Sequence, residues 1–447
     1  MDKEKIWEVI KASQIEYIAL QYVDLFGKIY QLWVPSSELE IAVKEGISVS
    51  GWPYFGTLEN SDVILKPDVN SFRILPWLKD GRITAGVMCD IYRPETMEEV
   101  EDNPRFLLKR AIGRLKKELG MDVDVHAAPE LEFFLLERDK DGKLRFHDNG
   151  SYFSPPPADK GYELREDICR CLVSMGIKVV KSHHEVPRGK HEINIEHDEA
   201  LMMADKVQFY KLVVRKMASD RGLIATFMPK PFDWEFGAGW HIHMSVINSR
   251  TGENLFYSNQ SRYGLSELGM QFMAGVLKHA KALAAVTCPT VNSYKRMVPG
   301  SQAPIYIAWA KYNRSALLRL PASTPQGTRF EYRPSDGSCN IYLAFAALIS
   351  AGLDGIVHKE QLPPPVEKNI YKLTKEERLR LGIETLPGNL GEALEELEAD
   401  EVIRSSLNPL TPKYLSAKWR EWQEYSYKVH EWERERYLEE NYPYMEV

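Results

Sequence analysis

The sequence lacks the marks of several protein classes. Its 447 residues include only five cysteines, odd in number and not in zinc spacing, so we expect reduced thiols in a cytosolic protein. No apolar run approaches the roughly 18 residues that suggest a membrane span. The segment 1–13 predicts an amphipathic helix without the apolar core of a signal peptide. Basic residues (57) nearly match acidic ones (64), and no basic tail is present, which argues against nucleic acid as a partner.

Length and composition indicate a folded protein of more than one domain. The chain is 44% hydrophobic and 27% charged, as in ordinary globular proteins, and is too long for a single core. The segment 93–104 is acidic, contains two prolines and has little apolar content, so we place a boundary there. We expect a small domain at 1–100 and a larger one at 104–447.

One helix is predicted by its end signals as well as by its apolar face. Asn103 is placed to cap the helix 104–119, and Pro104 occupies its first position. Gly120 follows the last apolar residue and should end the helix.

Three further helices are predicted from composition and apolar spacing. We expect buried helices at 265–285 and 341–356, and one long helix at 412–441. The long helix carries a hydrophobic stripe that we interpret as core or subunit interface: Trp419, Trp422, Val429 and Trp432.

Charged side chains alternate along segments that otherwise resemble buried strands. Residues i and i+2 share a strand face, so Glu130 and Glu132 in APELEFFLL should point together. The same pattern recurs in other segments: Arg329, Glu331 and Arg333 in GTRFEYRP, His241, His243 and Ser245 in GWHIHMSV, and Glu185 and Glu192 in HHEV and KHEINIEH.

These charged rows predict a metal site rather than a solvated surface. Solvated faces of surface strands are the simpler alternative. However, apolar residues flank the rows, and charged groups are rarely deep in a fold unless they are paired or bind metal. Carboxylates and imidazole without thiolates suit Mg²⁺ or Mn²⁺, and the interleaved arginines suit phosphate or carboxylate groups.

A metal site with phosphate-binding arginines implies a nucleotide, yet the usual nucleotide-binding loops are missing. The sequence contains no GxxxxGK[ST] loop, and FGAGWH falls short of GxGxxG. HHEVPRGKHE does not have the HExxH spacing of zinc proteases. We therefore expect metals and side chains to hold the phosphates.

Taken together, the motifs resemble glutamine synthetase of the type I class, compact non-adenylylated subclass. The similar segments are PELEFF, HHEVxxGxHEI, GAGWHIHMS, NSYKRxVPG with NRSALLRLPA, and RFEYRxxDxSCNxYLAFAxLxxAGLDGI. They run in order from about residue 60 to the C-terminus. The resemblance implies an α+β fold with a small N-terminal β-grasp domain and a larger catalytic α/β domain on a curved antiparallel sheet, an incomplete barrel. It also implies a dodecamer of two hexameric rings that share active sites, without regulation at Tyr371.

The resemblance also implies roles for individual residues, with two or three Mg²⁺ or Mn²⁺ ions per site and ATP as a substrate. One ion is expected on Glu132, Glu185 and Glu192, and a second on Glu130, His241 and Glu331. Glutamate is expected at Gly237, Arg296 and Arg333. ATP is expected at His243, Ser245, Arg314, Arg319 and Arg329, with Arg314 and Arg333 acting in catalysis.

The sequence departs from the family at the residues that would bind ammonium. Ser50, Gly51, Trp52 and Pro53 stand where the family has Asp-Gly-Ser-Ser, and Ser301, Gln302, Ala303 and Pro304 stand where it has Tyr-Glu-Ala-Pro. Phe236 replaces an asparagine. Glutamine cannot act as a base, so an ammonium site is weakened; Glu59 or Asp62 would compensate if the loop alignment is shifted.

Three functions follow. The first is an ATP-dependent carboxylate–amine ligase that forms a γ-glutamyl amide through a γ-glutamyl phosphate, with an organic amine in place of ammonia. The second is glutamine synthetase itself. The third is a non-catalytic structural or regulatory relative, which the intact metal set argues against.

Overall fold

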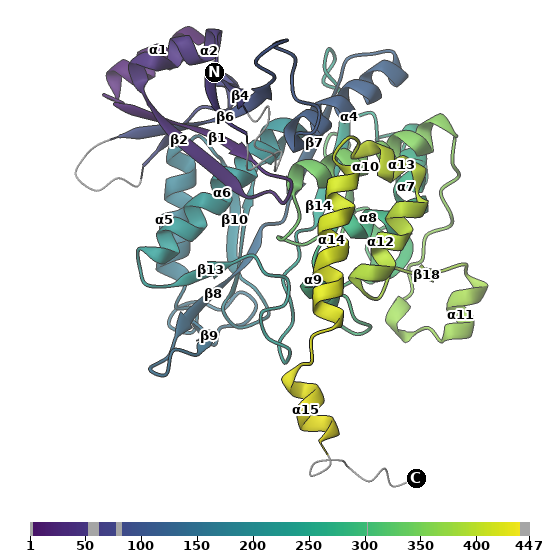
Figure 1. Cartoon of the computed structure of the whole chain (residues 1–447). Helices are drawn as coiled ribbons and strands as arrows, with labels where there is room; N and C mark the ends of the chain where they lie inside the picture. Colours follow the sequence, from purple (N-terminus) through teal and green to yellow (C-terminus); the bar gives the residue numbers. More distant parts are fainter. Residues whose placement is uncertain (1–2, 52–61, 77–82, 302, 439–447) are drawn as a thin grey trace.

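The computed structural model describes residues 3–51, 62–76, 83–301 and 303–438 (Figure 1). Within these residues the strands form three sheets. The first sheet has the order β2-β1-β6-β4-β3, with β5 on β6. Its strands are β1 (Tyr17–Val23), β2 (Ile29–Pro35), β3 (Ile47–Ser50), β4 (Asp62–Pro67), β5 (Arg73–Leu75) and β6 (Thr84–Tyr92). Two helices, α1 (Lys3–Ala12) and α2 (Leu39–Lys44), accompany this N-terminal sheet.

The other two sheets belong to the larger part of the chain and curve into a half-barrel. The five-stranded sheet contains β8 (Glu132–Arg138), β9 (Leu144–Phe146), β10 (Val179–His184), β11 (Lys190–Ile195) and β13 (Ile224–Thr226). The seven-stranded sheet contains β7 (Val123–Pro129), β12 (Asp198–Glu199), β14 (Ile242–Asn248), β15 (Tyr306–Ala310), β16 (Ala316–Arg319), β17 (Phe330–Tyr332) and β18 (Glu384–Thr385). The expected fold class, a β-grasp domain with a curved-sheet catalytic domain, is confirmed.

Helices surround these two sheets (Figure 1). They are α4 (Pro104–Leu119), α5 (Tyr162–Ser174), α6 (Ala200–Ser219), α7 (Glu267–Lys278), α8 (Ala280–Thr287), α9 (Val291–Arg296), α10 (Ile341–Val357), α11 (Lys375–Arg380), α12 (Leu390–Ala399), α13 (Glu401–Ser406), α14 (Thr411–Ser426) and α15 (Glu431–Tyr437). No helix among the described residues combines the length and apolar character that a bilayer crossing requires.

The helix predicted at 104–119 is confirmed together with its end signals. Asn103 accepts a hydrogen bond from the backbone N–H of Arg105 at 2.9 Å, and Pro104 is the first helical residue. Gly120 has φ 62°, the left-handed conformation that ends many helices. The helix at 341–356 is also confirmed, as α10.

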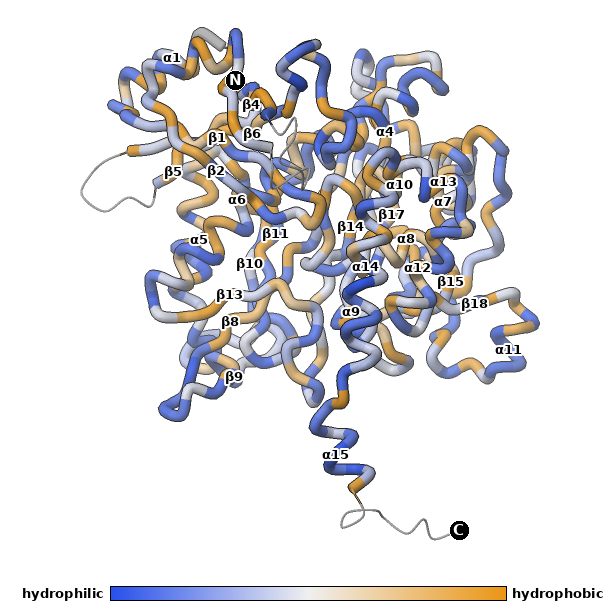
Figure 2. Tube along the Cα trace, in the orientation of Figure 1, coloured by the Kyte–Doolittle hydropathy of each residue, from blue (hydrophilic) through white to orange (hydrophobic). Residues whose placement is uncertain are grey.

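Two segments predicted as single helices each contain two helices, so these predictions were wrong. The segment 265–285 is split at His279 into α7 and α8, where the imidazole contacts Asp400 and Asp354. The expected long helix at 412–441 ends at Ser426, and the short α15 follows. Figure 1 shows α15 extending away from the body, and Figure 2 shows that it is mostly hydrophilic.

The hydrophobic stripe of the predicted tail helix is divided by the same break. Trp419 and Trp422 pack against the core. Val429 and Trp432 are 60% and 61% exposed, so only the first half of the stripe is core in this chain.

A buried arginine provides several of the contacts that join the N-terminal sheet to the larger part. Arg105, at the start of α4, contacts Asp68 after β4, Asp90 on β6 and Asp205 on α6. Tyr342 donates a hydrogen bond to the same Asp205 carboxylate at 2.6 Å. A buried guanidinium with three carboxylates therefore fixes the two parts against each other.

Candidate functional site

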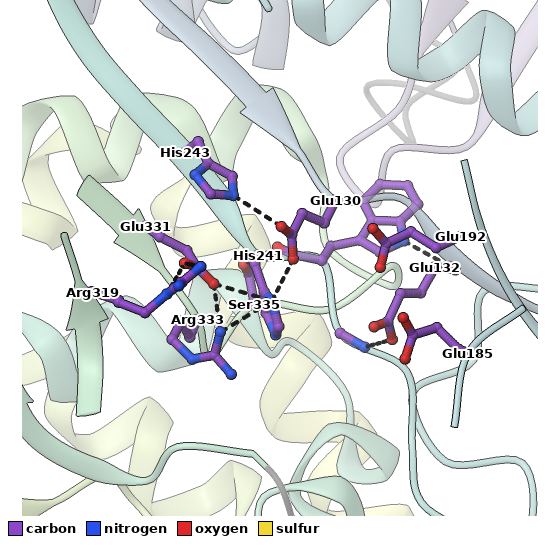
Figure 3. A network of polar contacts seen from close by, with 12 residues as sticks. Glu130, Glu132, Glu185, Glu192, His241, His243, Arg319, Glu331, Arg333 and Ser335 are labelled. Carbon is purple, nitrogen blue, oxygen red and sulfur yellow. Dashed lines mark hydrogen bonds and ion pairs between the residues drawn. The ribbon is translucent and has the colours of Figure 1, made fainter. Parts of the chain in front are cut away.

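The first candidate metal group lies where β7, β14 and β17 meet. Glu130, His241 and Glu331 each offer a ligand atom, and these atoms lie within 4.8 Å of one another. His241 Nδ1 is 2.8 Å from Glu130 Oε2 and 3.4 Å from Glu331 Oε1 (Figure 3). The structure therefore assembles the second predicted ion site from segments that are far apart in the sequence.

Glu130 does not share a strand with Glu132, so the expectation of one continuous charged strand was wrong. Strand β7 ends at Pro129 and β8 begins at Glu132, with the chain passing from one sheet to the other between them. The backbone N–H of Glu130 instead donates to the carbonyl of His241 at 2.9 Å. Glu130 and Glu132 thus lie on either side of the point where the chain passes from one sheet to the other.

Glu331 is fully buried between two arginines. Its Oε1 is 2.5 Å from Arg333 Nη1, and its Oε2 is 2.5 Å from Arg319. Burial alone would raise the pKa of this carboxyl, but Arg333 and the nearby imidazoles lower it to about 2. Burial would likewise raise the pKa of Glu130, but hydrogen bonds from His241 and His243 hold it well below the usual range. Both carboxylates are therefore ionised at neutral pH.

A second group forms at the ends of β10 and β11. His183, Glu185 and Glu192 offer ligand atoms within 4.8 Å of one another. His183 Nδ1 is 3.4 Å from Glu185 Oε1, and its Nε2 is 3.4 Å from Glu192 Oε1. Burial and the neighbouring Glu132 carboxylate raise the pKa of Glu185 to about 7.

Glu132, predicted as the third ligand beside Glu185 and Glu192, has other partners. Its Oε2 accepts hydrogen bonds from Lys190 Nζ at 2.9 Å and from the backbone N–H of Gly239 at 2.7 Å. Figure 3 shows Glu132, Glu185 and Glu192 close together. However, Glu132 is not among the converging ligand atoms within 4.8 Å, whereas His183 is.

The residues predicted for glutamate form one wall of the site. Arg296 is buried and donates to the Pro334 carbonyl at 2.6 Å. A Cβ at Gly237 would lie 2.3 Å from the Pro229 carbonyl and 2.9 Å from Arg296, and a Cβ at Gly239 would lie 2.5 Å from the same guanidinium. Glycine is therefore required where this backbone approaches Arg296.

The residues predicted for ATP are divided between two places. His243 accepts a hydrogen bond from Arg329 at Nδ1 (3.1 Å) and is 3.2 Å from Glu130 through Nε2. Ser245 lies two residues further along β14, half-buried. Arg314 is exposed and lines the pocket described next. His243 and Arg329 thus adjoin the first metal group, while their role in binding ATP stays a prediction.

A pocket of about 590 Å³ joins most of the predicted residues. It is lined by both metal groups except Glu331, and by Glu132, Gly237, Arg296, Arg314 and Arg333. Its lining also includes Tyr152, Val186 and Phe236. The positive and negative groups of the site therefore open into one space. We call its three aromatic and aliphatic lining residues, Tyr152, Val186 and Phe236, the apolar wall.

The altered amine residues are only partly described. Phe236 lines the pocket and is 37% exposed. Ser50 ends β3 and is not among the lining residues of the pocket of its own chain. Asp62 is exposed and pairs with Ser50 across the β3–β4 ladder. Gln302, Trp52, Pro53 and Glu59 lie outside the described residues.

Sequence reasoning missed three basic residues of the site. His183 belongs to the second metal group, and Lys181 and Lys190 line the pocket. All three stand in or next to the HHEV and KHEINIEH segments, at even spacing from the predicted ligands. That i, i+2 spacing was the available signal.

Comparison with known proteins agrees with this geometry. Sequence models of the glutamine synthetase catalytic domain and of the glutamine synthetase β-grasp domain match residues 101–437 and 14–94. Glutamine synthetase of Thermotoga maritima is 44% identical over 443 residues, covering 98% of this chain and 100% of the relative. That of Thermus thermophilus is 44% identical over 448 residues, covering 98% of each. A solved structure described as a GmaS/ADP complex superposes with a TM-score of 0.86 at 30% identity, covering 96% of this chain and 97% of that one. The chain belongs to the glutamine synthetase family.

Proposed function

We propose that this protein joins the γ-carboxylate of glutamate to an organic amine. Membership of the family makes the chain an ATP-dependent ligase that forms C–N bonds. The identity of the amine is the specific proposal. It rests on one observation: the apolar wall lies in the same pocket as the charged lining residues. We call these charged residues, which include Glu130, Arg314 and Arg333, the ionic wall.

The ionic wall suits phosphoryl transfer to a carboxylate. Divalent ions held by Glu130, His241 and Glu331 would neutralise phosphate charge when bound. Arg333 and Arg314 line the same pocket and supply further positive charge for the transferred phosphate. Arg296, held by the Pro334 carbonyl beside Gly237, is positioned for a substrate carboxylate.

The reaction then proceeds in two displacements. An oxygen of the glutamate γ-carboxylate attacks the γ-phosphorus of ATP, ADP leaves, and an acyl phosphate forms. The nitrogen of the amine attacks the acyl carbon, phosphate leaves, and the nitrogen loses a proton. Water must be excluded in the interval because it would hydrolyse the acyl phosphate.

The amine end favours an amine with a hydrocarbon part. Phe236 is 37% exposed and lines the pocket together with Val186. Apolar surface stabilises a buried alkyl or aryl group by about 25 cal/mol per Å² but offers ammonium nothing in return for its hydration. The departures at Ser50 and Gln302 also favour an organic amine over ammonium, since neither residue carries a negative charge.

The amine specificity is tested by measuring ADP formation from ATP, Mg²⁺ and glutamate with ammonia and with alkyl, aryl and polyamine nucleophiles. We expect kcat/KM for at least one organic amine to exceed that for ammonia by about 100-fold or more, about 2.7 kcal/mol. Ammonia turnover at a higher kcat/KM than every amine would instead identify glutamine synthetase proper, the activity named for its 44% identical relatives. Nucleotide binding without ADP release for any amine would support a non-catalytic role.

A matched pair of variants tests the pocket wall. Phe236→Asn should shift the ratio of kcat/KM values toward ammonia, because it replaces the ring by a polar amide. Trp234→Asn is the control, since Trp234 lies in the same loop and is 59% exposed, but does not line the pocket. An equal shift in both variants would trace the effect to the loop and not to the wall.

We further propose the family's shared-site assembly, two stacked hexameric rings. Ser50, one of the altered amine residues, does not line the pocket of its own chain. This is expected if Ser50 contributes to the site of a neighbouring subunit. The mass of the particle by light scattering tests this, and a monomer with full activity would refute it.

A further inference from the structure

The ion site predicted at Glu132, Glu185 and Glu192 already contains two lysine side chains. Lys190 Nζ lies 2.9 Å from Glu132 Oε2 and 3.8 Å from Glu185 Oε2, and it donates to the Gly237 carbonyl at 3.2 Å. Lys181 Nζ lies 3.2 Å from Glu192 Oε1. Each of the three carboxylates expected to share an ion therefore has an ammonium group against it.

The strands themselves place these lysines at the site. Lys190 precedes Glu192 by two residues on β11, and Lys181 precedes His183 by two on β10, so each pair shares a strand face. The antiparallel register sets His183 opposite Glu192 and Glu192 opposite Glu132. Lys190 is 5% exposed, so its ammonium group depends on these carboxylates and the Gly237 carbonyl in place of water.

The other ion site is built differently. Glu130 is contacted by the imidazoles of His241 and His243, and no lysine or arginine of the described chain forms an ion pair with it. Arg319 and Arg333 both contact Glu331, and Arg333 also lies 3.5 Å from His241 Nδ1. At this site a divalent ion could bind Glu130, a carboxylate without a lysine or arginine partner. In the group with the two lysines, each of the three carboxylates already lies near an ammonium group.

We propose that the ammonium group of Lys190, supported by Lys181, takes the place of one divalent ion. Tight divalent binding is then confined to Glu130, His241 and Glu331. The inference rests on the proposed phosphoryl-transfer function and specifies that the site holds one tightly bound divalent ion and one ammonium group. The ammonium group of Lys190 donates a hydrogen bond to the Gly237 carbonyl, next to the wall proposed for glutamate.

A second ion at this group would have Glu192 Oε1 and His183 Nε2 as ligand atoms. These two atoms lie 3.4 Å from each other. An ion between them would be close to the ammonium of Lys181, which lies 3.2 Å from the same oxygen. Repulsion at such a distance predicts a second ion bound at least about 100-fold more weakly than the first.

Metal stoichiometry of the full-length protein tests the proposal without an activity assay. Metal-free protein is titrated with Mn²⁺ in the absence of nucleotide, by calorimetry and by the paramagnetic resonance signal of free Mn²⁺. We expect one tight ion per chain in the unmodified protein. Lys190→Gln should gain a second tight ion, and Lys190→Met should do the same. Two equally tight ions in the unmodified protein, or no gain in either variant, would overturn the proposal.

Two further variants separate this inference from the function on which it rests. Lys178→Gln is the matched control, because Lys178 precedes β10, is well exposed and pairs with Glu196 outside the site. It should leave one tight ion. Glu331→Gln should remove the tight ion of the unmodified protein, whereas Lys190→Gln with Glu331→Gln should keep the gained ion. If Glu331→Gln left the tight ion in place, the metal assignment of the proposed function would fail, regardless of the lysine result.

Discussion

Glu331 offers the sharpest test of the phosphoryl-transfer end. It lies on the short strand β17, with no exposed surface. The change Glu331→Gln removes one negative charge and almost no volume. Its two oxygens each contact an arginine at 2.5 Å, and His241 lies 3.4 Å away. The substitution therefore isolates the charge.

The expected magnitude follows from the partners that are left behind. A unit charge about 4 Å from an opposite charge contributes about 4 kcal/mol at an effective dielectric near 20. The neutral amide of the variant is not a charged acceptor for Arg319 and Arg333, and breaking a buried ion pair by removing one partner costs about 3–5 kcal/mol. The predicted ion also loses one of its two carboxylates. We expect the rate of ADP formation to fall by at least about 1000-fold, near 4 kcal/mol of barrier.

The assay combines three measurements on the same preparation. Initial rates of ADP formation report catalysis, Mn²⁺ titration reports the ion, and the thermal unfolding midpoint reports whether the fold persists. Glu137→Gln is the control, because Glu137 on β8 pairs with His147 and Arg145 near the surface, away from the pocket. A folded Glu331→Gln protein with a rate within about tenfold of the parent would refute the assignment.

Three other outcomes follow from the described contacts. Arg105→Met should cost about 3–5 kcal/mol of unfolding free energy in urea, because it leaves the Asp205 carboxylate buried and without its ion-pair partner. Burial would lower the pKa of His279, but hydrogen bonds to Asp400 and Asp354 raise it above 6.5. This stabilisation is complete below that value and is lost as pH rises through the folded pKa, so His279→Gln should lower the unfolding midpoint more at about pH 5.5 than at about pH 9. Removal of divalent ions by a chelator should stop ADP formation, and added Mg²⁺ should restore it, whereas activity that survives chelation would count against a metal role.

The helices show how far local signals reach. The ends of α4 were predictable because Asn103, Pro104 and Gly120 act on the residues next to them. The break between α7 and α8 was not, because His279 is held by Asp354 on α10 and by Asp400, 75 and 121 residues away. Such a break depends on tertiary contacts that periodicity does not contain.

The site divides in a similar way. Alternation of charge pointed to Glu130 and Glu132, which both line the pocket although they do not lie on one strand. The position of Glu130 between two strands was missed, because apolar residues continue through APELEFFLL and conceal the change of sheet. Lys181 and Lys190 were missed because lysine on a strand usually faces solvent. Only the pairing of β8, β10 and β11 places them against the carboxylates.

The apolar wall also predicts how kcat/KM should depend on the length of the amine's hydrocarbon chain. Each methylene buried from water contributes about 0.8 kcal/mol, a factor of about four in kcat/KM. In a series of straight-chain primary amines, kcat/KM should therefore rise about fourfold per carbon until the chain passes Phe236 and Val186, and then level off or fall. Phe236→Asn should flatten the slope while Trp234→Asn preserves it. A flat series in the unmodified protein would show that the wall does not contact the nucleophile, and the amine proposal would then lose its structural basis.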